Sequence, residues 1–457
     1  MPPPVRLEFV AQSARDPAHV QGTTERLINL YAEPQGPEAA GRWALKAVPG
    51  LRSWATLPGL FVRALAEIDG RLFGVIGGRA YEISAAGVAT DLGAVADSEV
   101  TFISGNRGAV TIAAGGRYYV IDDDGLSEPG LTAVTDVGSV EFLAGRTIIA
   151  ERGGRLLQWS DIGEPHTFNG LNVATAELSD ETVLRLLAVS GNLMVFKDHS
   201  TEVWAPTGAG GADAFSPIPG MLLERGILGP TLAVKIPDGV FFVGDDGVCY
   251  LATGAQFQPV STPAINIAIR QTTPSHVAYY EHEGHRFCVV RFPVQSGKPA
   301  LVCDLATQLW HERASGSGAW LVTHTARAFG SWRAGATGGA VAELAAQHFD
   351  DLGEPLRRVA VSRTLRLPRG LVVSEVALSG KIGQADIGRE ARAMVRASRD
   401  GGQTWGMERT VGMGPLGVYD RRARLGSWGT ARTMTFEVAL TDPADLTLDS
   451  AAEVTTG

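Results

Sequence analysis

From about residue 60 to residue 345, short apolar runs alternate with Gly, Asp and Asn. The runs are four to seven residues long and rich in β-branched and aromatic residues, as in RLFGVI (71–76) and GVFFV (239–243). Turn-forming pairs such as Asp69-Gly70 and Gly115-Gly116 separate them. This pattern predicts short antiparallel strands joined by tight turns.

Four segments share one layout, in which a strand, a Gly-containing turn and a second strand follow each other. They are GRLFGVIGGRAYEI (70–83), GAVTIAAGGRYYVI (108–121), GRTIIAERGGRLLQW (145–159) and GVFFVGDDGVCYLA (239–252). A loose repeat of roughly 40–50 residues is typical of propeller blades. We interpret these segments as the central hairpins of four-stranded blades, and we expect a β-propeller over residues 61–350.

Longer strands with period-two alternation follow, for example at 371–378 and 433–440. They predict an additional antiparallel β platform or sandwich domain over residues 351–457. Residues 1–60, with several Pro and Gly, are expected to form an N-terminal arm and a first strand. Helical signal is weak: residues 180–187 could form a short helix, but the surrounding pattern favours a strand entered at Val183. The predicted fold class is all-β.

The segment SRDGGQTW (398–405) matches the Asp-box pattern of β-propeller proteins, S-x-D-x-G-x-T-W. We expect a tight hairpin in which Gly401 and Gly402 provide positive φ angles and Asp400 accepts hydrogen bonds from turn amides. Trp405 should pack under the turn. The motif residues are Ser398, Asp400, Gly402, Thr404 and Trp405, and we interpret them as a structural staple without catalytic function.

Composition limits the chemistry. The chain has 457 residues, a net charge of −9 and three widely spaced cysteines, Cys249, Cys288 and Cys303. No apolar run of 18 residues predicts a membrane span, and the N-terminal residues lack the apolar stretch of a signal peptide. The cysteines are too few for a disulfide framework, so we expect assembly in a reducing cytosol. The negative charge argues against tight phosphate binding.

Three weak motifs do not predict a metal, cofactor or catalytic site. His282-Glu-Gly-His285 lacks the zincin spacing, and Gly284 favours a hairpin turn. The acidic stretch 122–125 lacks the closing Glu of a calcium loop. Residues 208–211 lack the Lys-Ser/Thr that follows a phosphate-binding loop. We expect no cofactor.

Positive charge is concentrated near residues 357–369 and 420–424. These clusters could bind nucleic acid, but such clusters more often pair with acidic groups of a neighbouring subunit. The candidate contact residues are Arg357, Arg358, Arg421, Arg422 and Arg424.

Five segments together resemble the packaged-DNA-stabilisation proteins, also described as tail hub or nozzle proteins, of short-tailed bacteriophages. They begin with ERLINLYAEPQG…WALKAVPGL (25–51) and GNLMVFKDHSTEVWAPTGA (191–209). Residues 223–265 and 279–313 follow, the latter ending in WHER, and the last is SRDGGQTWG…TFEVALTDP (398–443). Their shared order makes the resemblance specific, although no segment is a catalytic signature.

The resemblance implies a β-propeller with a platform domain and a homo-hexameric ring at the tail axis. Such a nozzle extends the portal–adaptor channel, retains packaged DNA and conducts it on ejection. Implied partners are the phage adaptor, a tail fibre or tailspike, a tail needle or plug, and DNA that passes without sequence-specific binding. The protein would belong to the virion tail, assemble in the bacterial host cytoplasm and not insert into membranes.

Six such copies would carry a net charge of −54, which would repel DNA phosphates from an acidic lumen. Candidate lumen acids are Asp122, Asp123, Asp124, Asp180, Glu181, Asp245 and Asp246, which could equally be solvated hairpin tips. Two other functions stay open. A sialidase-like glycosidase needs an arginine trio, a Tyr–Glu pair and an acid Asp, which nothing in the sequence ties together. A host-surface binding tail protein would form trimers.

Overall fold

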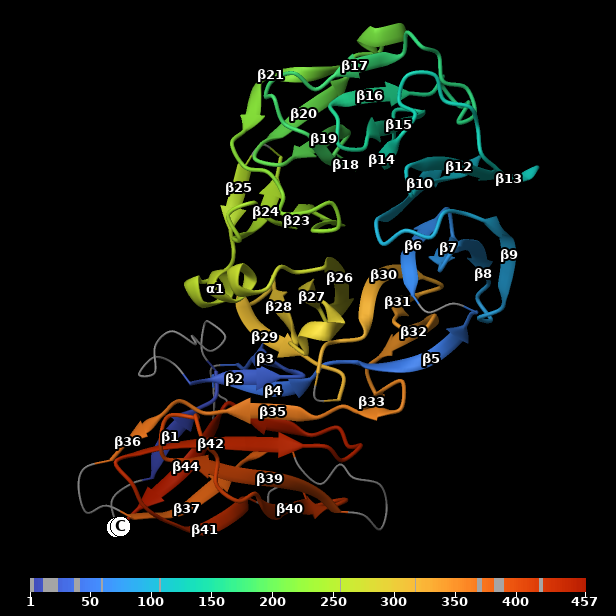
Figure 1. Ribbon diagram of the computed structural model, residues 1–457. Coiled ribbons are helices and arrows are strands. Elements are labelled where there is room, and N and C mark those ends of the chain that lie inside the picture. The colour runs from blue at the N-terminus through green and yellow to red at the C-terminus, as the bar shows by residue number, and fades with distance from the viewer. Residues whose placement is uncertain are drawn as a thin grey trace.

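The computed structural model describes residues 4–10, 24–36, 42–58, 61–106, 108–254, 256–316, 318–367, 372–381, 390–418 and 422–457. Figure 1 shows a ring of small sheets beside a β-sandwich. The described residues contain one α-helix, α1 (Pro263–Gln271), and two short 3₁₀ helices, Gly211–Ala214 and Val294–Ser296. The predicted all-β class, with a propeller and an antiparallel sandwich, is confirmed.

Seven four-stranded blades form the ring within the described residues. Six of the blades each consist of four consecutive strands. The first three are β6 (Val62–Ile68), β7 (Arg71–Ile76), β8 (Arg79–Ile83) and β9 (Ala89–Ala94); then β10 (Thr101–Asn106), β11 (Ala109–Ala114), β12 (Arg117–Asp122) and β13 (Gly125–Ser127); then β14 (Val137–Leu143), β15 (Arg146–Glu151), β16 (Leu156–Trp159) and β17 (Val173–Thr175). The next three are β18 (Val183–Val189), β19 (Asn192–Lys197), β20 (Thr201–Pro206) and β21 (Phe215–Leu223); then β22 (Ala233–Ile236), β23 (Gly239–Val243), β24 (Cys249–Thr253) and β25 (Gln256–Pro259); then β26 (His276–His282), β27 (His285–Arg291), β28 (Ala300–Asp304) and β29 (Leu309–Arg313).

The seventh blade combines both ends of the propeller sequence. It contains β30 (Val322–Ala328), β31 (Ser331–Ala336), β32 (Ala340–Ala345) and, as its outer strand, β5 (Gly50–Thr56). Its inner strand β30 lies against β6 of the first blade, which closes the ring. Antiparallel pairing of β5 with β32 therefore fastens the propeller with a strand from the N-terminal segment. Ala55 and Leu57 add to the apolar core between these two blades.

The four repeated segments occupy the expected positions. Each forms the second and third strands of a blade, namely β7–β8, β11–β12, β15–β16 and β23–β24. The apolar faces of neighbouring blades pack against each other because strand residues alternate between the two faces of a sheet. The segment from Val183 forms the strand β18, as its surroundings indicate.

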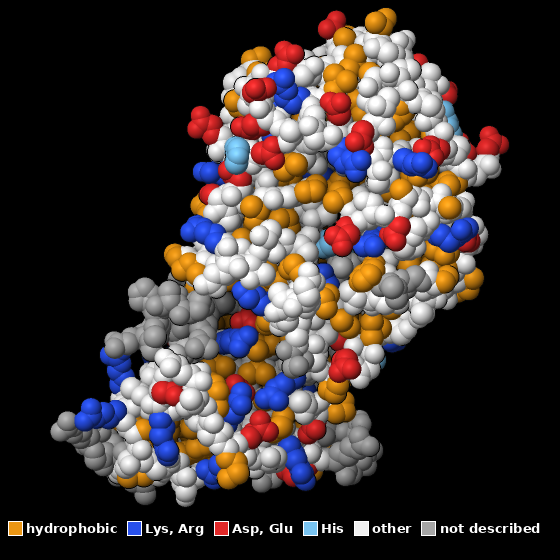
Figure 2. All heavy atoms as spheres, viewed as in Figure 1, with side chains coloured by type: hydrophobic (Ala, Val, Ile, Leu, Met, Phe, Trp, Pro, Cys, Tyr) orange, Lys and Arg blue, Asp and Glu red, His pale blue; other side chains and the backbone are white. Residues whose placement is uncertain are grey.

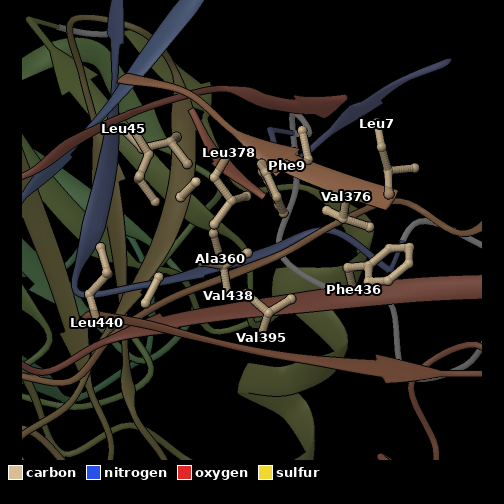
Figure 3. Packing of buried hydrophobic residues seen from close by; sticks show 14 of the residues in the cluster. Leu7, Phe9, Leu45, Ala360, Val376, Leu378, Val395, Phe436, Val438 and Leu440 are labelled. Carbon is tan, nitrogen blue, oxygen red and sulfur yellow. The ribbon is translucent and has the colours of Figure 1, made fainter. Parts of the chain in front are cut away.

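Two sheets enclose the sandwich core. One contains β1 (Val5–Glu8), β44 (Ala451–Thr456), β37 (Val372–Leu378) and β41 (Ala423–Thr430). The other contains β35 (Arg358–Val361), β42 (Thr433–Leu440), β39 (Glu390–Ser398) and β40 (Arg409–Pro415), with β36 (Leu365–Arg366) also paired to β42. Figure 3 shows their apolar side chains meeting, among them Leu7, Val376, Phe436 and Val438.

One continuous sheet joins the propeller to the sandwich. The strand β2 (Arg26–Ile28) pairs in parallel with β29 of the sixth blade through Ile28 and Glu312, and antiparallel with β35. The resulting sheet has ten strands. Figure 1 shows β2 between the ring and the sandwich. Backbone hydrogen bonds thus run from the outer edge of a blade into the sandwich.

The first 60 residues contribute to both parts of the molecule. β1 lies in the sandwich, β2 forms the joint and β5 closes the propeller. A small sheet beside the joint contains β3 (Leu30–Pro34), β4 (Trp43–Ala47), β43 (Thr447–Asp449) and β38 (Gly380–Lys381), while β33 (Asp350–Asp351) and β34 (Glu354–Pro355) extend the seventh blade. The predicted domain boundaries at residues 60 and 350 stay predictions.

Candidate functional site

The Asp-box residues are hydrogen-bonded to one another. Asp400 accepts hydrogen bonds from the amides of Gln403 and Thr404 at 3.0 and 2.9 Å. The Ser398 hydroxyl donates to Asp400 at 2.6 Å and accepts from the Gly402 amide at 2.8 Å. Hydrogen bonds from Ser398 and Thr404 hold the pKa of Asp400 well below its usual range. The carboxylate therefore stays ionised and acts as a turn staple.

The loop around this staple is longer than a two-residue hairpin turn. Gly401 and Gly402 have φ angles of 73° and 86°, as expected, but ten residues separate β39 from β40. Trp405 is half-buried, with the Arg396 guanidinium 5.0 Å from its ring centroid. It packs on a small apolar cluster formed by Val359, Val361 and Ala439. Trp405 therefore fixes the loop on the outer face of the sandwich sheet.

The candidate lumen acids lie on opposite faces of the propeller. In a four-stranded blade, the turn between strands three and four is on one face, and the turn between strands two and three is on the other, as is the connection to the next blade. Asp122, Asp123 and Asp124 occupy a turn of the first kind, between β12 and β13. The other four, Asp180, Glu181, Asp245 and Asp246, occupy positions of the second kind.

Most of these acids have basic partners nearby. Asp122 bonds to His166 at 2.6 Å, which lowers the pKa of Asp122. Asp180 lies 2.5 Å from the Arg155 guanidinium. The remaining pairs join Asp245 to His199 and Arg225, Asp246 to Arg225, and Glu181 to the Ser200 hydroxyl. The structure gathers Glu181, Asp245 and Asp246 around His199 and Arg225, and keeps Asp122–Asp124 apart from them.

The candidate contact arginines differ in exposure. Arg422 and Arg424 are exposed on or next to β41, and they pair with Glu453 at 2.6 Å and Glu375 at 3.6 Å. Arg357 is half-buried between Glu408 and Glu437. Arg421 lies outside the described residues.

Arg358 does not offer its charge to a neighbouring molecule. It is fully buried and donates to the backbone carbonyls of Ala444 and Asp442. Burial lowers the pKa of Arg358 to about 10. The sequence pattern grouped it with exposed arginines, whereas it stabilises the sandwich core.

The segment 191–209 contains a fully buried ion pair that sequence reasoning missed. The Lys197 ammonium contacts the Glu202 carboxylate, and both side chains have no exposed surface. Lys197 also donates to the carbonyls of Ala176 and Ser179 at 2.8 and 3.0 Å. Glu202 accepts from the Trp204 indole N–H at 2.8 Å. The pair thus holds the entry loop of the fourth blade against its second and third strands.

A second buried polar cluster fills the joint between propeller and sandwich. Asn29 is fully buried, and its side-chain amide donates to the carbonyls of Ala314 and Arg357 at 3.0 and 2.9 Å. Its carbonyl oxygen accepts from the Ala314 amide at 3.0 Å. Beside it, Arg26 forms a two-pronged ion pair with Glu312. One side chain therefore connects the end of the sixth blade to the start of the sandwich.

The His282–His285 segment forms a hairpin turn between β26 and β27, with Glu283 and Gly284 at φ angles of 48° and 84°. His285 bonds to Asp304 through Nδ1 at 2.7 Å and to Glu33 of β3 through Nε2 at 2.9 Å. The hydrogen bond to Asp304 raises the pKa of His285, burial opposes this, and the bond to Glu33 adds to the increase. Protonated His285 therefore ties the β3–β4 hairpin to the sixth blade.

The two hydrogen bonds of His285 to Asp304 and Glu33, here called the His285 clamp, should stabilise the protein less as pH rises. A histidine whose pKa is higher in the folded than in the unfolded protein stabilises the fold while it is protonated. This stabilisation is complete below the unfolded-state pKa, near 6.5, and is lost as pH increases through the folded-state pKa. We expect the difference in unfolding free energy between wild type and His285→Gln to shrink between pH 6 and pH 9. The decrease should be about 1.4 kcal/mol per unit of pKa increase. Denaturant titrations across this pH range measure it, and a constant difference would contradict the clamp.

A cavity of about 520 Å³ lies on the propeller axis, bordered by the inner strands of all seven blades. Its charged lining residues are Glu67, Glu141, Arg185, Lys235 and Arg327. Lys235 pairs with Glu141 at 2.6 Å. Sequence reasoning missed this site because its residues come from separate blades, and no local motif brings them together.

The described residues provide no group of three or more His, Cys, Asp or Glu side chains suited to hold a metal ion. The three cysteines are buried and unpaired, and burial raises the pKa of each thiol. In the same described ranges, no helix has the length and apolar character of a membrane span.

Solved structures with a similar arrangement are distant. The computationally designed Ika8 protein is 13% identical, with a TM-score of 0.42 over 64% of this chain and 99% of that one. The WD40 domain of Neurospora crassa Pan2 is 9% identical, with a TM-score of 0.42 over 65% and 94%. PorZ of Porphyromonas gingivalis is 14% identical, with a TM-score of 0.39 over 78% and 46%. At TM-scores below 0.5, these similarities do not bear on function.

Models of whole protein families identify the family of this chain, whereas individual curated proteins do not. A comparison with curated proteins finds no match. The model described as the bacteriophage P22 Gp10 β-propeller matches residues 14–337, and the bacteriophage P22 Gp10 β-sandwich model matches residues 357–456. The two matches follow the propeller and the sandwich in chain order and cover most of the sequence. The protein therefore belongs to the bacteriophage P22 Gp10 family, the phage tail hub family that its sequence motifs indicate.

Proposed function

We propose that this protein is a tail nozzle subunit that extends the portal–adaptor channel, retains packaged DNA and conducts it on ejection. The observation that carries the proposal is the match of both Gp10 domains in order. The continuous ten-stranded sheet supports it, because a channel wall that resists DNA pressure needs domains that do not hinge. We place the protein in the virion tail, after assembly in the host cytoplasm.

The distribution of charge between the two domains supports contacts between copies or with the adaptor. Residues 357–457 contain 15 Lys and Arg against 11 Asp and Glu, a net charge of +4. Since the whole chain carries −9, residues 1–356 carry −13. In the view of Figure 2, basic side chains gather over the sandwich and many acidic ones over the propeller. Such a bipolar subunit favours head-to-tail contacts between copies or docking to an acidic face of the adaptor.

Reversing charge on the sandwich should disrupt the ring. We expect the double substitution Arg422→Glu and Arg424→Glu to weaken assembly about tenfold or more, since each position becomes repulsive towards an acidic neighbour. Both side chains are exposed, so the monomer should stay folded. Sedimentation velocity measures assembly, with Arg79→Glu on the first blade as a control of equal charge change per site. An unchanged ring would contradict this contact.

DNA retention can be tested separately with particles assembled without this protein. We expect such capsids to package DNA and then release it, so that their DNA becomes sensitive to added nuclease. Adding back the purified protein should restore protection. Particles that keep their DNA and only fail to adsorb to cells would contradict the nozzle function and favour a host-surface binding protein.

The geometry does not favour the sialidase-like alternative. Such an enzyme needs an acid Asp in an axial cleft, but no Asp borders the axial cavity within the described residues. Tyr279 donates to Glu281 at 2.6 Å, which resembles a Tyr–Glu pair. However, burial and the Glu281 contact raise the pKa of Tyr279 strongly, so its phenolate is a poor candidate nucleophile.

A further inference from the structure

One end of the axial cavity concentrates positive charge, and the acid nearest to it is shared with a lysine. Arg185 extends from β18 and lies over the Phe102 ring of β10, with its guanidinium carbon 3.5 Å from the ring centroid. Its Nε and Nη1 are buried and have no hydrogen-bond partner among the described residues. The residue as a whole is half-buried and borders the cavity. Its nearest acid, Glu141, is already paired with Lys235.

Arg291 adds a second charge behind the cavity wall. It lies on β27, is buried, and donates to the Trp320 carbonyl at 2.9 Å and the Ser275 hydroxyl at 3.3 Å. Its Nη2 has no partner in the described part of the chain, and no ion pair with an acid is formed there. The charges of Arg185 and Arg291 both act on His324, so the two guanidinium groups lie at the same end of the cavity.

Two histidines line the cavity at the same end. His276 and His324 are in edge-to-face contact, with ring centroids 5.2 Å apart. Nδ1 of His276 is buried and has no partner in the described structure. Burial and the charges of Arg291 and Arg63 lower the pKa of His276 to about 4. Burial lowers the pKa of His324 well below its usual range, with contributions from His276, Arg185 and Arg291. Both rings are therefore neutral at pH 7, and each carries one N–H. Nδ1 of His324 already bonds to the Thr323 hydroxyl at 3.0 Å, so His276 is the candidate donor.

We propose that this end of the axial cavity binds a small oxyanion of the size of phosphate or sulfate, with Arg185 as the charged ligand and His276 as a second donor. The cavity volume of about 520 Å³ accommodates such an ion with its water. A dianion would neutralise the two guanidinium charges and form charge-assisted hydrogen bonds. The site lies inside each propeller and does not depend on the proposed ring.

Inorganic phosphate is the direct probe. In calorimetric titrations of the intact protein at constant ionic strength, we expect saturable binding by wild type and at least about tenfold weaker binding by Arg185→Met. Arg327→Met, which borders the same cavity but is placed at the other end of its inner strand and pairs with Glu281, should bind as wild type does. Equal binding by wild type and Arg185→Met would overturn the assignment, as would the absence of saturable binding.

A measurement on wild type covers the case in which Arg185→Met does not fold. Bound phosphate adds negative charge beside His276 and His324, so both pKa values should increase. The imidazole resonances, followed by NMR during a pH titration with and without phosphate, report this change, with His276→Gln used for assignment. Identical titration curves with saturating phosphate and with chloride at equal ionic strength would overturn the site.

Discussion

Replacing Lys197 with Met will lower the free energy of unfolding by about 3–5 kcal/mol, because it leaves the Glu202 carboxylate buried without a counter-charge. Neither side chain of the pair has exposed surface, so water cannot replace the lost contact. The carbonyls of Ala176 and Ser179 lose their donor in the same substitution. Denaturant unfolding followed by tryptophan fluorescence measures the change, since Trp204 bonds directly to Glu202.

Two further variants separate the pair from a general effect of substitution. The double variant Lys197→Met with Glu202→Gln should lose less than the sum of the single variants, because the stranded charge is removed. Arg71→Met breaks the solvent-accessible Arg71–Glu82 pair of the first blade and should change stability by about 1 kcal/mol or less. If Lys197→Met behaves like Arg71→Met, the pair does not hold the fourth blade together.

Replacing Asn29 with Ala will destabilise the protein by about 4 kcal/mol and separate the unfolding of propeller and sandwich. Three hydrogen bonds to Ala314 and Arg357 are lost, which leaves buried backbone groups without partners. The residue also has a φ angle of 55°, a left-handed conformation that Asn tolerates and Ala adopts at a cost of about 1 kcal/mol. Calorimetry should show one transition for wild type and two for the variant.

Asn29→Gly is the matched control for backbone strain. Gly removes the same side-chain hydrogen bonds but adopts positive φ readily, so it should be about 1 kcal/mol more stable than Asn29→Ala. Asn29→Asp keeps the oxygen that accepts from Ala314 and should have an intermediate effect. A single unchanged transition in Asn29→Ala would show that the continuous sheet alone couples the two domains.

The sequence predicted the fold class well because strand and turn signals are local. All four repeated segments became the second and third strands of blades, where apolar runs face two neighbouring sheets. The helix α1 was missed, although Pro263 at its first turn and the apolar spacing of Ile265 and Ile269 are recognisable signals. The strand pattern on both sides of this segment was the stronger signal, so no helix was predicted there.

Long-range pairing was beyond the reach of a single sequence. Nothing near residues 50–56 indicates that they pair with residues 340–345, because register depends on partners almost 300 residues away. The sequence also does not show which of two adjacent polar residues is buried. Arg357 and Arg358 are neighbours, yet only Arg358 faces the core. Asn29, Lys197 and Glu202 lie in segments that carry the family resemblance, but no sequence signal indicated that these three polar side chains are buried and hydrogen-bonded.

The assembly is tested most directly by electron microscopy of the purified protein and of intact particles, with the copies counted around the tail axis. The nozzle account predicts a six-fold ring with a central channel, formed by whole subunits in which propeller and sandwich keep the arrangement of Figure 1. A monomeric propeller with an open axial pocket, or a trimer at the tip of a fibre, would contradict it.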